Sequence, residues 1–276
     1  MRCFLLTLML LFPLLGLSQS ERWIYDGCKS ISDYVILEKF VGRNAFDSCV
    51  NLRTVRFSQS VAEIGDYAFN NCPSLKTFIV DSRNENFCTI DGVLYSSDFK
   101  TIVCCPNARA TNGFKIHEGV TTIASCAFLG CENLTEITIP DHVEVIGLSA
   151  FEKCVNLTSV YISANVREIQ GCAFSTCYKL QKFEVDTNNK YFTSIDGVLY
   201  NHDKTRLISC PNRSEYTIPS SVKIIGEYAF QGCKSLTSVT IPNSVEIIED
   251  GAFSDCDGLT SIDIPQSVRE IRNAAF

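Results

Sequence analysis

The stretch Leu236–Cys256, LTSVTIPNSVEIIEDGAFSDC, holds one full copy of the pattern that decides the fold. Val239 and Ile241 alternate with polar residues, which is the period of a strand with one buried face. A second apolar pair, Val245 and Ile248, follows before an Ala-Phe pair and a Cys. Because one such strand cannot form a core alone, the pattern predicts stacked copies whose strands pair in parallel.

The Ala-Phe pair recurs along the chain in steps of 23, 59, 23, 23, 56, 23 and 23 residues. A Cys stands three residues after each Phe except the last, and a Leu three residues further on. Fixed periods of this length are typical of leucine-rich repeat solenoids. The segment between Phe and Cys is too short for a regular helix, so we expect a helical or 3₁₀ turn there, with the Phe rings stacked inside. The eight positions are Phe46, Phe69, Phe128, Phe151, Phe174, Phe230, Phe253 and Phe276.

The two long steps contain a second motif. Asp-Gly-Val-Leu-Tyr occurs at residues 91–95 and again at 196–200, and Cys-Pro-Asn follows each copy, at 105–107 and 210–212. Asp-Gly between apolar residues is a strong hairpin signal, because both turn residues need a positive φ. We therefore expect a small β-meander in each insert, at about 81–113 and 186–215. A calcium site at these Asp-rich turns is disfavoured, because the carboxylates are few and lack a ligand loop.

The repeat resembles the BspA-like leucine-rich repeats of treponemal type, with the form L-x-x-I-x-I-P-x-x-V-x-x-I-G-x-x-A-F-x-x-C. The resemblance covers about residues 41–276 and implies a right-handed α/β-type superhelix rich in short parallel strands. It also implies a secreted or surface protein that binds host matrix proteins or other cells. Gln170, Glu249 and Arg272 depart from the pattern by replacing its Gly. Glu38 replaces an apolar residue, which indicates a capping first coil within residues 21–45.

The N-terminus is typical of a secretory signal peptide. A basic start is followed by an apolar run of about 15 residues, shorter than the ~20 of a spanning helix, and by small residues. We expect a signal peptide at 1–18, with cleavage after residue 18 or 20, and no membrane span in the mature chain. The chain stops at Phe276, in the middle of a repeat, so we also expect the solenoid at 46–276 to be truncated.

The composition is acidic and rich in cysteine. A net charge of −7 argues against nucleic acid as a partner. Seven of the 15 Cys share one repeat position, which favours small buried side chains over redox staples or a metal strip. The other Cys of the mature chain are irregular, and their pairing cannot be deduced from sequence. Cys126 and Cys172, each two residues before a repeat Phe, are the first candidates for a disulfide.

No catalytic, cofactor or metal site is predicted. The three His lie outside any metalloprotease pattern, and no nucleophile elbow, phosphate loop or dinucleotide fingerprint is present. A Cys–His nucleophile is disfavoured because the available Cys belong to the repeat.

Binding is expected on the outward strand positions, which we predict to line the concave face. Small hydroxyls dominate that face, and Arg56, Ile79 and Tyr161 stand out as candidate contacts, since aromatic and Arg side chains dominate binding hot spots. Scattered surface residues without a partner are the alternative. Three sites fit the N-glycosylation pattern, which matters only in a eukaryotic host: Asn133, Asn156 and Asn212.

We therefore hypothesise a secreted or cell-surface solenoid that binds proteins or cells and has no enzymatic activity. The alternative is a substrate-docking arm of a larger enzyme, or the ectodomain of a receptor or signalling protein. The ligand, the disulfide pairing, the oligomeric state and the source, bacterial or protozoan, do not follow from the sequence.

Overall fold

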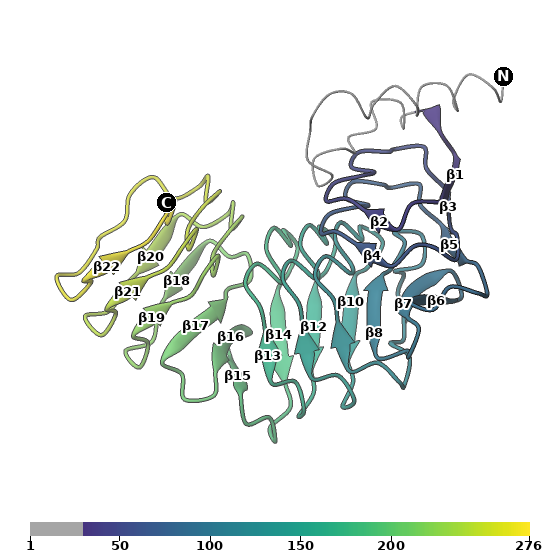
Figure 1. Cartoon of the computed structure of the whole chain (residues 1–276). Coiled ribbons are helices and arrows are strands. Elements are labelled where there is room, and N and C mark those ends of the chain that lie inside the picture. The colour runs from purple at the N-terminus through teal and green to yellow at the C-terminus, as the bar shows by residue number, and fades with distance from the viewer. Residues whose placement is uncertain (1–29) are drawn as a thin grey trace.

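The computed structural model describes residues 30–276 and shows a solenoid of short strands (Figure 1). The expected signal peptide, the start of the expected capping segment and Cys28 lie outside the described residues. Strands 23 residues apart pair in parallel, as the repeat predicts; Val160 of one coil aligns with Ile137 of the coil before it and Phe183 of the coil after it. None of the described residues belongs to a helix with the length and hydropathy needed to cross a bilayer.

The coils form three groups, each with its own hydrophobic core. In the N-terminal coils (33–80), one sheet contains β1 (Asp33–Ile36), β3 (Thr54–Phe57) and β5 (Thr77–Val80), and another contains β2 (Phe40–Val41) and β4 (Glu63–Ile64). In the middle coils (105–185), the longer strands are β10 (Glu136–Ile139), β12 (Ser159–Ile162) and β14 (Lys182–Val185), and the shorter ones are β9 (Thr122–Ile123), β11 (Val145–Ile146) and β13 (Glu168–Ile169). In the C-terminal coils (210–276), the strands are β18 (Glu215–Thr217), β19 (Ile224–Ile225), β20 (Ser238–Thr240), β21 (Ile247–Ile248) and β22 (Glu270–Ile271).

The two inserts are antiparallel meanders, as predicted. They contain β6 (Phe87–Ile90), β7 (Val93–Ser96) and β8 (Thr101–Cys104), then β15 (Phe192–Ile195), β16 (Val198–Asn201) and β17 (Arg206–Ser209). Each meander continues the sheet of short strands, because β8 pairs with β9 and β17 with β19, both in parallel.

Each meander also separates two cores. Leu94 of β7 packs into the N-terminal core, whereas its neighbours Val93 and Tyr95 pack into the middle core. Successive side chains of a strand point to opposite faces, so the apolar Val-Leu-Tyr run fits a strand buried on both sides. The same arrangement recurs at β16, where Leu199 packs into the middle core and its neighbours into the C-terminal core.

The hairpin turns have the predicted geometry. Asp196 and Gly197 have φ values of 50° and 77°, and Asp91 and Gly92 have the same values. In both meanders the tip of the turn caps the edge of a longer strand: the carbonyl of Gly92 accepts from Phe78 N and that of Gly197 from Phe183 N, at 2.9 and 2.8 Å. The meanders thus protect strand edges that would otherwise be left unpaired.

Replacing Gly197 by Ala is expected to lower the free energy of unfolding by about 2–3 kcal/mol, measured by urea denaturation. An added Cβ would lie 2.9 Å from Lys182 Cβ and 3.1 Å from Lys182 Cα, and φ is +77°. Gly113 is a matched control with φ +78° and nothing within 4 Å of an added Cβ, so Gly113→Ala is expected to lose only about 1 kcal/mol. Equal losses would show that the close contact is unimportant.

The predicted Phe stack is confirmed. Phe151 is fully buried between Phe128 and Phe174, with ring centroids 4.9 and 5.3 Å apart and rings within 10° of parallel. Equivalent stacked pairs occur in the N-terminal coils, between Phe46 and Phe69, and in the C-terminal coils.

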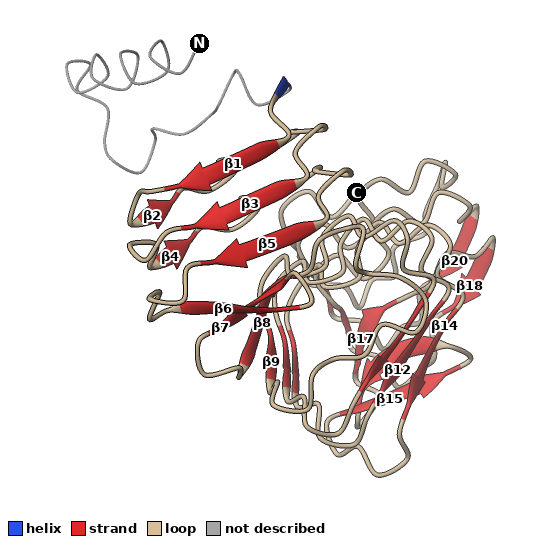
Figure 2. Cartoon of the chain, turned by 90° about the vertical axis from the view of Figure 1, so that its right-hand side faces the viewer, coloured by secondary structure: helices blue, strands red, loops and turns tan. Residues whose placement is uncertain are grey.

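The expected helical or 3₁₀ turn between Phe and Cys is wrong. Between Asp33 and Phe276 the structure contains no helix (Figure 2). The residues two before and two after each of the first seven repeat Phe are left-handed, as is Ala274 before Phe276; Cys126 and Gly130, for example, have φ of 59° and 66°. Alternate N–H groups therefore point to the next coil, so a helix cannot continue. The N–O distances there are 2.9 Å for Cys126–Leu148, 2.7 Å for Phe128–Ala150 and 2.8 Å for Gly130–Glu152.

Candidate functional site

The predicted binding positions do not form one continuous surface. Their strands are divided among separate sheets, β1–β3–β5, β10–β12–β14 and β18–β20. Arg56 on β3 and Ile79 on β5 are direct neighbours in register, whereas Tyr161 lies on β12, in a different sheet. Ser261 and Asp263, which hold the equivalent positions one repeat after Ser238 and Thr240 of β20, are in no strand.

The inner side of the bend is formed by turns rather than by strands. In Figure 1 the turns of the middle coils face the space between the N-terminal and C-terminal coils. The hydroxyl groups of Tyr67 and Ser149, which stand in turns of the N-terminal and middle coils, lie 2.8 Å apart. Binding through the outward strand positions stays a prediction.

The outward residues of β1, β3 and β5 and their flanks form a surface that we call the N-terminal strand face. Val35, Arg56 and Ile79 form a row across its three strands, because Val35 pairs with Arg56 and Arg56 with Ile79. The two aliphatic side chains are 50% and 39% exposed, and Leu37 beside them is 67% exposed. Figure 2 shows this sheet with its broad face open to the viewer.

A groove of about 590 Å³ runs over this face. At its rim, Arg83 binds Asp81 through two hydrogen bonds, of 3.0 and 2.9 Å, which lower the pKa of Asp81 to about 2. Arg83 is thus neutralised by its neighbour. The Arg56 side chain is exposed and forms no ion pair or hydrogen bond within residues 30–276. Hydrogen bonds from Ser32 and Thr54 lower the pKa of Asp33, and the nearby charge of Arg56 adds to this effect. The groove therefore presents a cation without a direct ion-pair partner between exposed aliphatic groups.

A second cavity, of about 620 Å³, lies on the turn side near the first meander. Several of the polar side chains around it already have hydrogen-bond partners, although Asn107 Oδ1 has none within residues 30–276. Asn70 donates to Asp47 at 2.8 Å, Asn71 donates to Ser48 at 3.1 Å, and Tyr67 binds Ser149. The N-terminal strand face is the better candidate site because its exposed aliphatic groups lie beside Arg56, whose side chain has no direct ion-pair partner within residues 30–276.

Tyr161 is held by its own neighbours. Its hydroxyl donates to Asp186 Oδ2 at 2.9 Å, and this bond to the carboxylate raises the pKa of Tyr161. The backbone N–H of Asn188 and this hydroxyl lower the pKa of Asp186. Tyr161 is therefore a fixed, half-buried residue apart from the N-terminal strand face.

The predicted glycosylation residues link neighbouring coils. The side-chain nitrogens of Asn133, Asn156 and Asn212 donate to backbone carbonyls of earlier residues, at 3.3, 2.8 and 3.0 Å. These nitrogens are the atoms that a glycan would modify. Glycosylation stays a prediction. The hydrogen bonds to backbone carbonyls give these residues a structural role in linking coils.

Six of the seven repeat cysteines form a ladder of hydrogen bonds, and the seventh, Cys49, is disulfide-bonded. In four of the six, Sγ donates to the carbonyl of the Phe in the previous coil, at 3.0 Å for Cys72–Phe46, 3.1 Å for Cys154–Phe128, 3.2 Å for Cys177–Phe151 and 3.1 Å for Cys256–Phe230. A small, weakly donating side chain is what this position requires. Within residues 30–276, no group of three or more His, Cys, Asp or Glu is arranged to hold a metal ion.

Two of the irregular cysteines also belong to this ladder. Cys105 and Cys210 occupy the Phe position of the coils that follow the meanders. Their carbonyls accept from Cys131 and Cys233 at 3.7 and 3.4 Å, and their N–H groups bind the next coil at 2.7 Å, as a repeat Phe does. The 23-residue pattern does not reveal this role, although the two Cys-Pro-Asn copies indicate a shared position.

The expected pairing candidates are free thiols. Cys126 and Cys172 lie two coils apart with Ser149 between them, about 9.6 Å at the usual strand spacing and beyond the ~7 Å reach of a disulfide. In residues 30–276, Cys49 is disulfide-bonded and the other twelve cysteines are free.

The free thiols are expected to react slowly with a disulfide reagent at pH 8 while the chain is folded. Burial raises the pKa of Cys72 to about 12 and of Cys256 to about 11, so their thiolate fraction at pH 8 is about a hundredfold or more below that of an unfolded Cys. Thiol titration with and without denaturant measures this difference. Rapid reaction of most thiols in the folded chain would contradict it.

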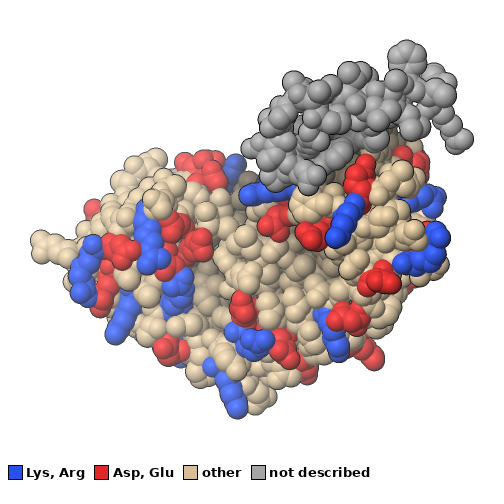
Figure 3. Space-filling model, viewed as in Figure 1, with Lys and Arg blue, Asp and Glu red and all other residues tan. Residues whose placement is uncertain are grey.

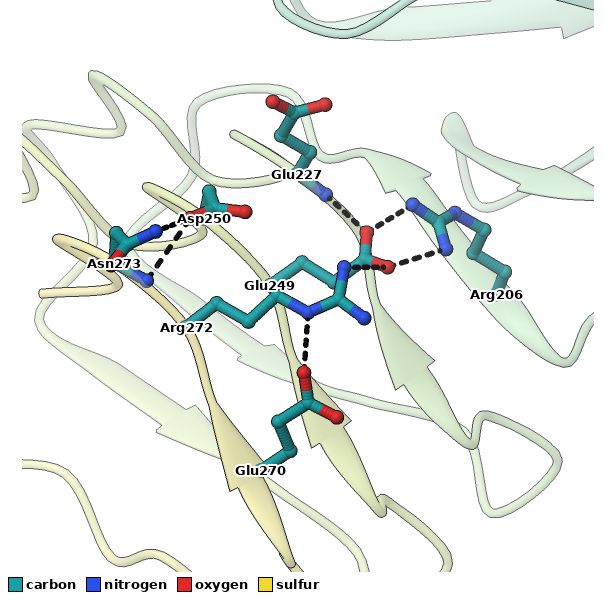
Figure 4. A network of polar contacts seen from close by, with 7 residues as sticks. All are labelled: Arg206, Glu227, Glu249, Asp250, Glu270, Arg272 and Asn273. Carbon is teal, nitrogen blue, oxygen red and sulfur yellow. Dashed lines mark hydrogen bonds and ion pairs between the residues drawn. The ribbon is translucent and has the colours of Figure 1, made fainter.

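Two departures from the repeat pattern meet in one ion-pair network (Figure 4). Glu249, which is 7% exposed, binds both terminal nitrogens of Arg206, the Nη1 of Arg272 at 3.1 Å and the N–H of Glu227 at 3.1 Å. Arg272 also donates to Glu270 at 2.6 Å. Glu249 and Arg272, which replace the repeat Gly, thus form an ion pair with each other. This pairing indicates that the two residues have a structural role.

Stacked parallel coils with an in-phase Leu, Phe and Cys define a leucine-rich repeat solenoid. The family model of the BspA type leucine rich repeat region matches six copies, in residues 18–110, 103–198 and 204–276. The chain therefore belongs to the BspA-type leucine-rich repeat family. No curated protein matches it.

Several solved structures are similar to this chain. A leucine-rich repeat protein from Eubacterium ventriosum has 26% identity and a TM-score of 0.56, over 89% of this chain and 57% of that one. This chain thus spans little more than half of that relative. A leucine rich cell surface protein from Faecalibacterium prausnitzii has 22% identity and a TM-score of 0.46, over 89% and 79%. The pneumococcal vaccine antigen PcpA has 19% identity and a TM-score of 0.45, over 90% and 70%.

Proposed function

We propose that this chain is a non-catalytic interaction solenoid, secreted or held at the cell surface, that binds a matrix protein or another cell through the N-terminal strand face. The observation that carries the proposal is Arg56, whose side chain forms no direct ion pair within residues 30–276, between the exposed side chains of Val35 and Ile79. Arg and large apolar groups supply most of the binding energy in protein interfaces. Tyr161 would be a separate contact, since it lies in another sheet.

Secretion is supported by the predicted signal peptide at residues 1–18. Family membership supports the same location, because the F. prausnitzii protein of this fold is described as a cell surface protein. On the side of the molecule drawn in Figure 3, positive and negative side chains are interspersed. A surface of mixed charge fits a protein partner better than nucleic acid.

The second candidate function is a docking arm of a larger enzyme, or a receptor ectodomain. The 57% coverage of the E. ventriosum protein leaves room for a longer natural chain. The gene sequence downstream of Phe276 separates the two: a catalytic domain or a membrane span favours the second candidate, and further repeats favour the first.

A pull-down tests the proposal. The purified chain, immobilised on beads, is incubated with extracellular matrix proteins and with intact cells, beside an unrelated acidic solenoid of similar net charge. We expect selective retention by this chain. Retention no greater than that of the control would refute the proposed function.

A further inference from the structure

The row Val35–Arg56–Ile79 has a spacing that selects the shape of its ligand. Neighbouring parallel strands lie about 4.8 Å apart, so Val35 and Ile79 are about 9.6 Å apart, with Arg56 on the strand between them. The row crosses the strands, along the axis on which the coils stack. A partner lying along this row meets an apolar, a cationic and an apolar group in turn.

An α-helix matches this spacing better than an extended segment. A helix rises 1.5 Å per residue, so positions i, i+4 and i+7 lie on one face at about 0, 6.0 and 10.5 Å. An extended chain presents every second residue to one face, so three successive contacts span about 13 Å. The helical span is within about 1 Å of the row, whereas the extended span exceeds it by more than 3 Å.

The charge of the row selects the middle residue of the ligand. Arg56 has no ion pair within residues 30–276, and a carboxylate is the group that a guanidinium binds best, through two parallel hydrogen bonds. Of the acidic groups nearby, Asp81 binds Arg83, whereas Asp33 accepts from Ser32 at 2.7 Å and interacts with Arg56 through its charge without a direct ion pair. A carboxylate arriving over the row therefore meets a guanidinium whose donors form no hydrogen bond within residues 30–276.

We propose that the N-terminal strand face binds an amphipathic α-helix of a partner protein, with apolar side chains at positions i and i+7 and a carboxylate at i+4. This inference rests on the proposed function and names the chemistry of its partner. The helix lies along the coil axis, its carboxylate binds Arg56, and its apolar residues contact Val35 and Ile79. Leu37 extends the apolar end of the contact.

Three fluorescent synthetic peptides test the proposal by anisotropy with the purified chain. The first is helical and contains Leu-x-x-x-Glu-x-x-Leu, the second has Lys in place of that Glu, and the third has a Pro that breaks the helix. We expect the Glu peptide to bind at least tenfold more tightly than either of the others. Equal affinities for Glu and Lys, equal affinities for the helical and Pro peptides, or no binding by any peptide would overturn the inference.

The variant Arg56→Glu should reverse the preference between the Glu and Lys peptides, and Arg53→Glu, another exposed Arg of the same coil, should leave it unchanged. Because the peptides are compared on the unaltered chain, the test holds even if a variant folds poorly. If the chain retains matrix proteins or cells but none of the peptides binds to it, the helical ligand is refuted and the proposed function stands. Failure of both would refute both.

Discussion

Replacing Phe151 by Ala is expected to lower the free energy of unfolding by about 3–5 kcal/mol. Its ring is fully buried and stacks on Phe128 above and on Phe174 below, at 4.9 and 5.3 Å. Removing it leaves a cavity that neighbouring coils cannot fill, because backbone hydrogen bonds fix their spacing on both sides. The aromatic contacts with both neighbours are lost as well.

Urea denaturation followed by circular dichroism measures this effect. Phe276→Ala is a matched control, because Phe276 is 52% exposed and stacks only on Phe253, at 5.5 Å. We expect the control to lose about 1 kcal/mol. Similar losses at the two positions would show that the Phe stack does not hold the middle coils together.

Replacing Asn189 by Asp is expected to have a comparable effect, about 3–5 kcal/mol at pH 7. Asn189 is 2% exposed and makes four hydrogen bonds. Its amide nitrogen donates to the carbonyls of Ser163 and Val166, at 2.7 and 3.0 Å, and its oxygen accepts two backbone N–H groups, both at 2.8 Å. A carboxylate keeps the acceptor but places a buried charge against two carbonyl oxygens.

The loss should shrink at pH 4. Burial raises the pKa of the introduced Asp above its unfolded value, so lowering the pH protonates it, removes the charge and restores one donor. Asn165→Asp is the control, since Asn165 is exposed and makes one such bond, to the carbonyl of Asp141 at 2.8 Å, and we expect it to lose less than about 1 kcal/mol. A small, pH-independent loss for Asn189→Asp would contradict this role.

The repeat period was sufficient to predict the stacked Phe rings, the parallel pairing and the two Asp-Gly hairpins. It did not reveal Asn189 or its equivalent Asn84, which makes the same four bonds next to the first meander. Asn is a common turn residue, so its presence before an insert does not by itself indicate a buried side chain. Its burial becomes clear only from the two backbone carbonyls of the preceding coil that accept its hydrogen bonds. Only the 105-residue offset between the copies indicated a shared role.

The conformation of the Phe–Cys turn could not be derived from local propensity. A short segment with i to i−3 bonds is compatible with a 3₁₀ turn, and such bonds do occur, as from Cys131 N to Phe128 O at 3.1 Å. The alternate N–H groups instead bind the next coil, and left-handed residues such as Cys126 make this possible. This conformation depends on neighbouring coils and is not encoded in one repeat.

The candidate site was predicted in part. Arg56 and Ile79 are 23 residues apart, so the repeat itself placed them side by side. Val35 precedes Arg56 by 21 residues rather than 23, so the repeat pattern does not identify Val35 as the equivalent residue of the first coil. Tyr161 keeps the same phase but is separated from them, because the sheet of longer strands is interrupted at each meander.

The central claim is that this chain binds its partner through the N-terminal strand face. The most direct test compares retention of matrix proteins and cells by the unaltered chain, by the double variant Val35→Ser/Ile79→Ser, and by Ile264→Ser, an equally exposed aliphatic residue of the last coil. We predict that the double variant loses at least fivefold in retention and that Ile264→Ser retains as much as the unaltered chain. Undiminished retention by the double variant would contradict the account.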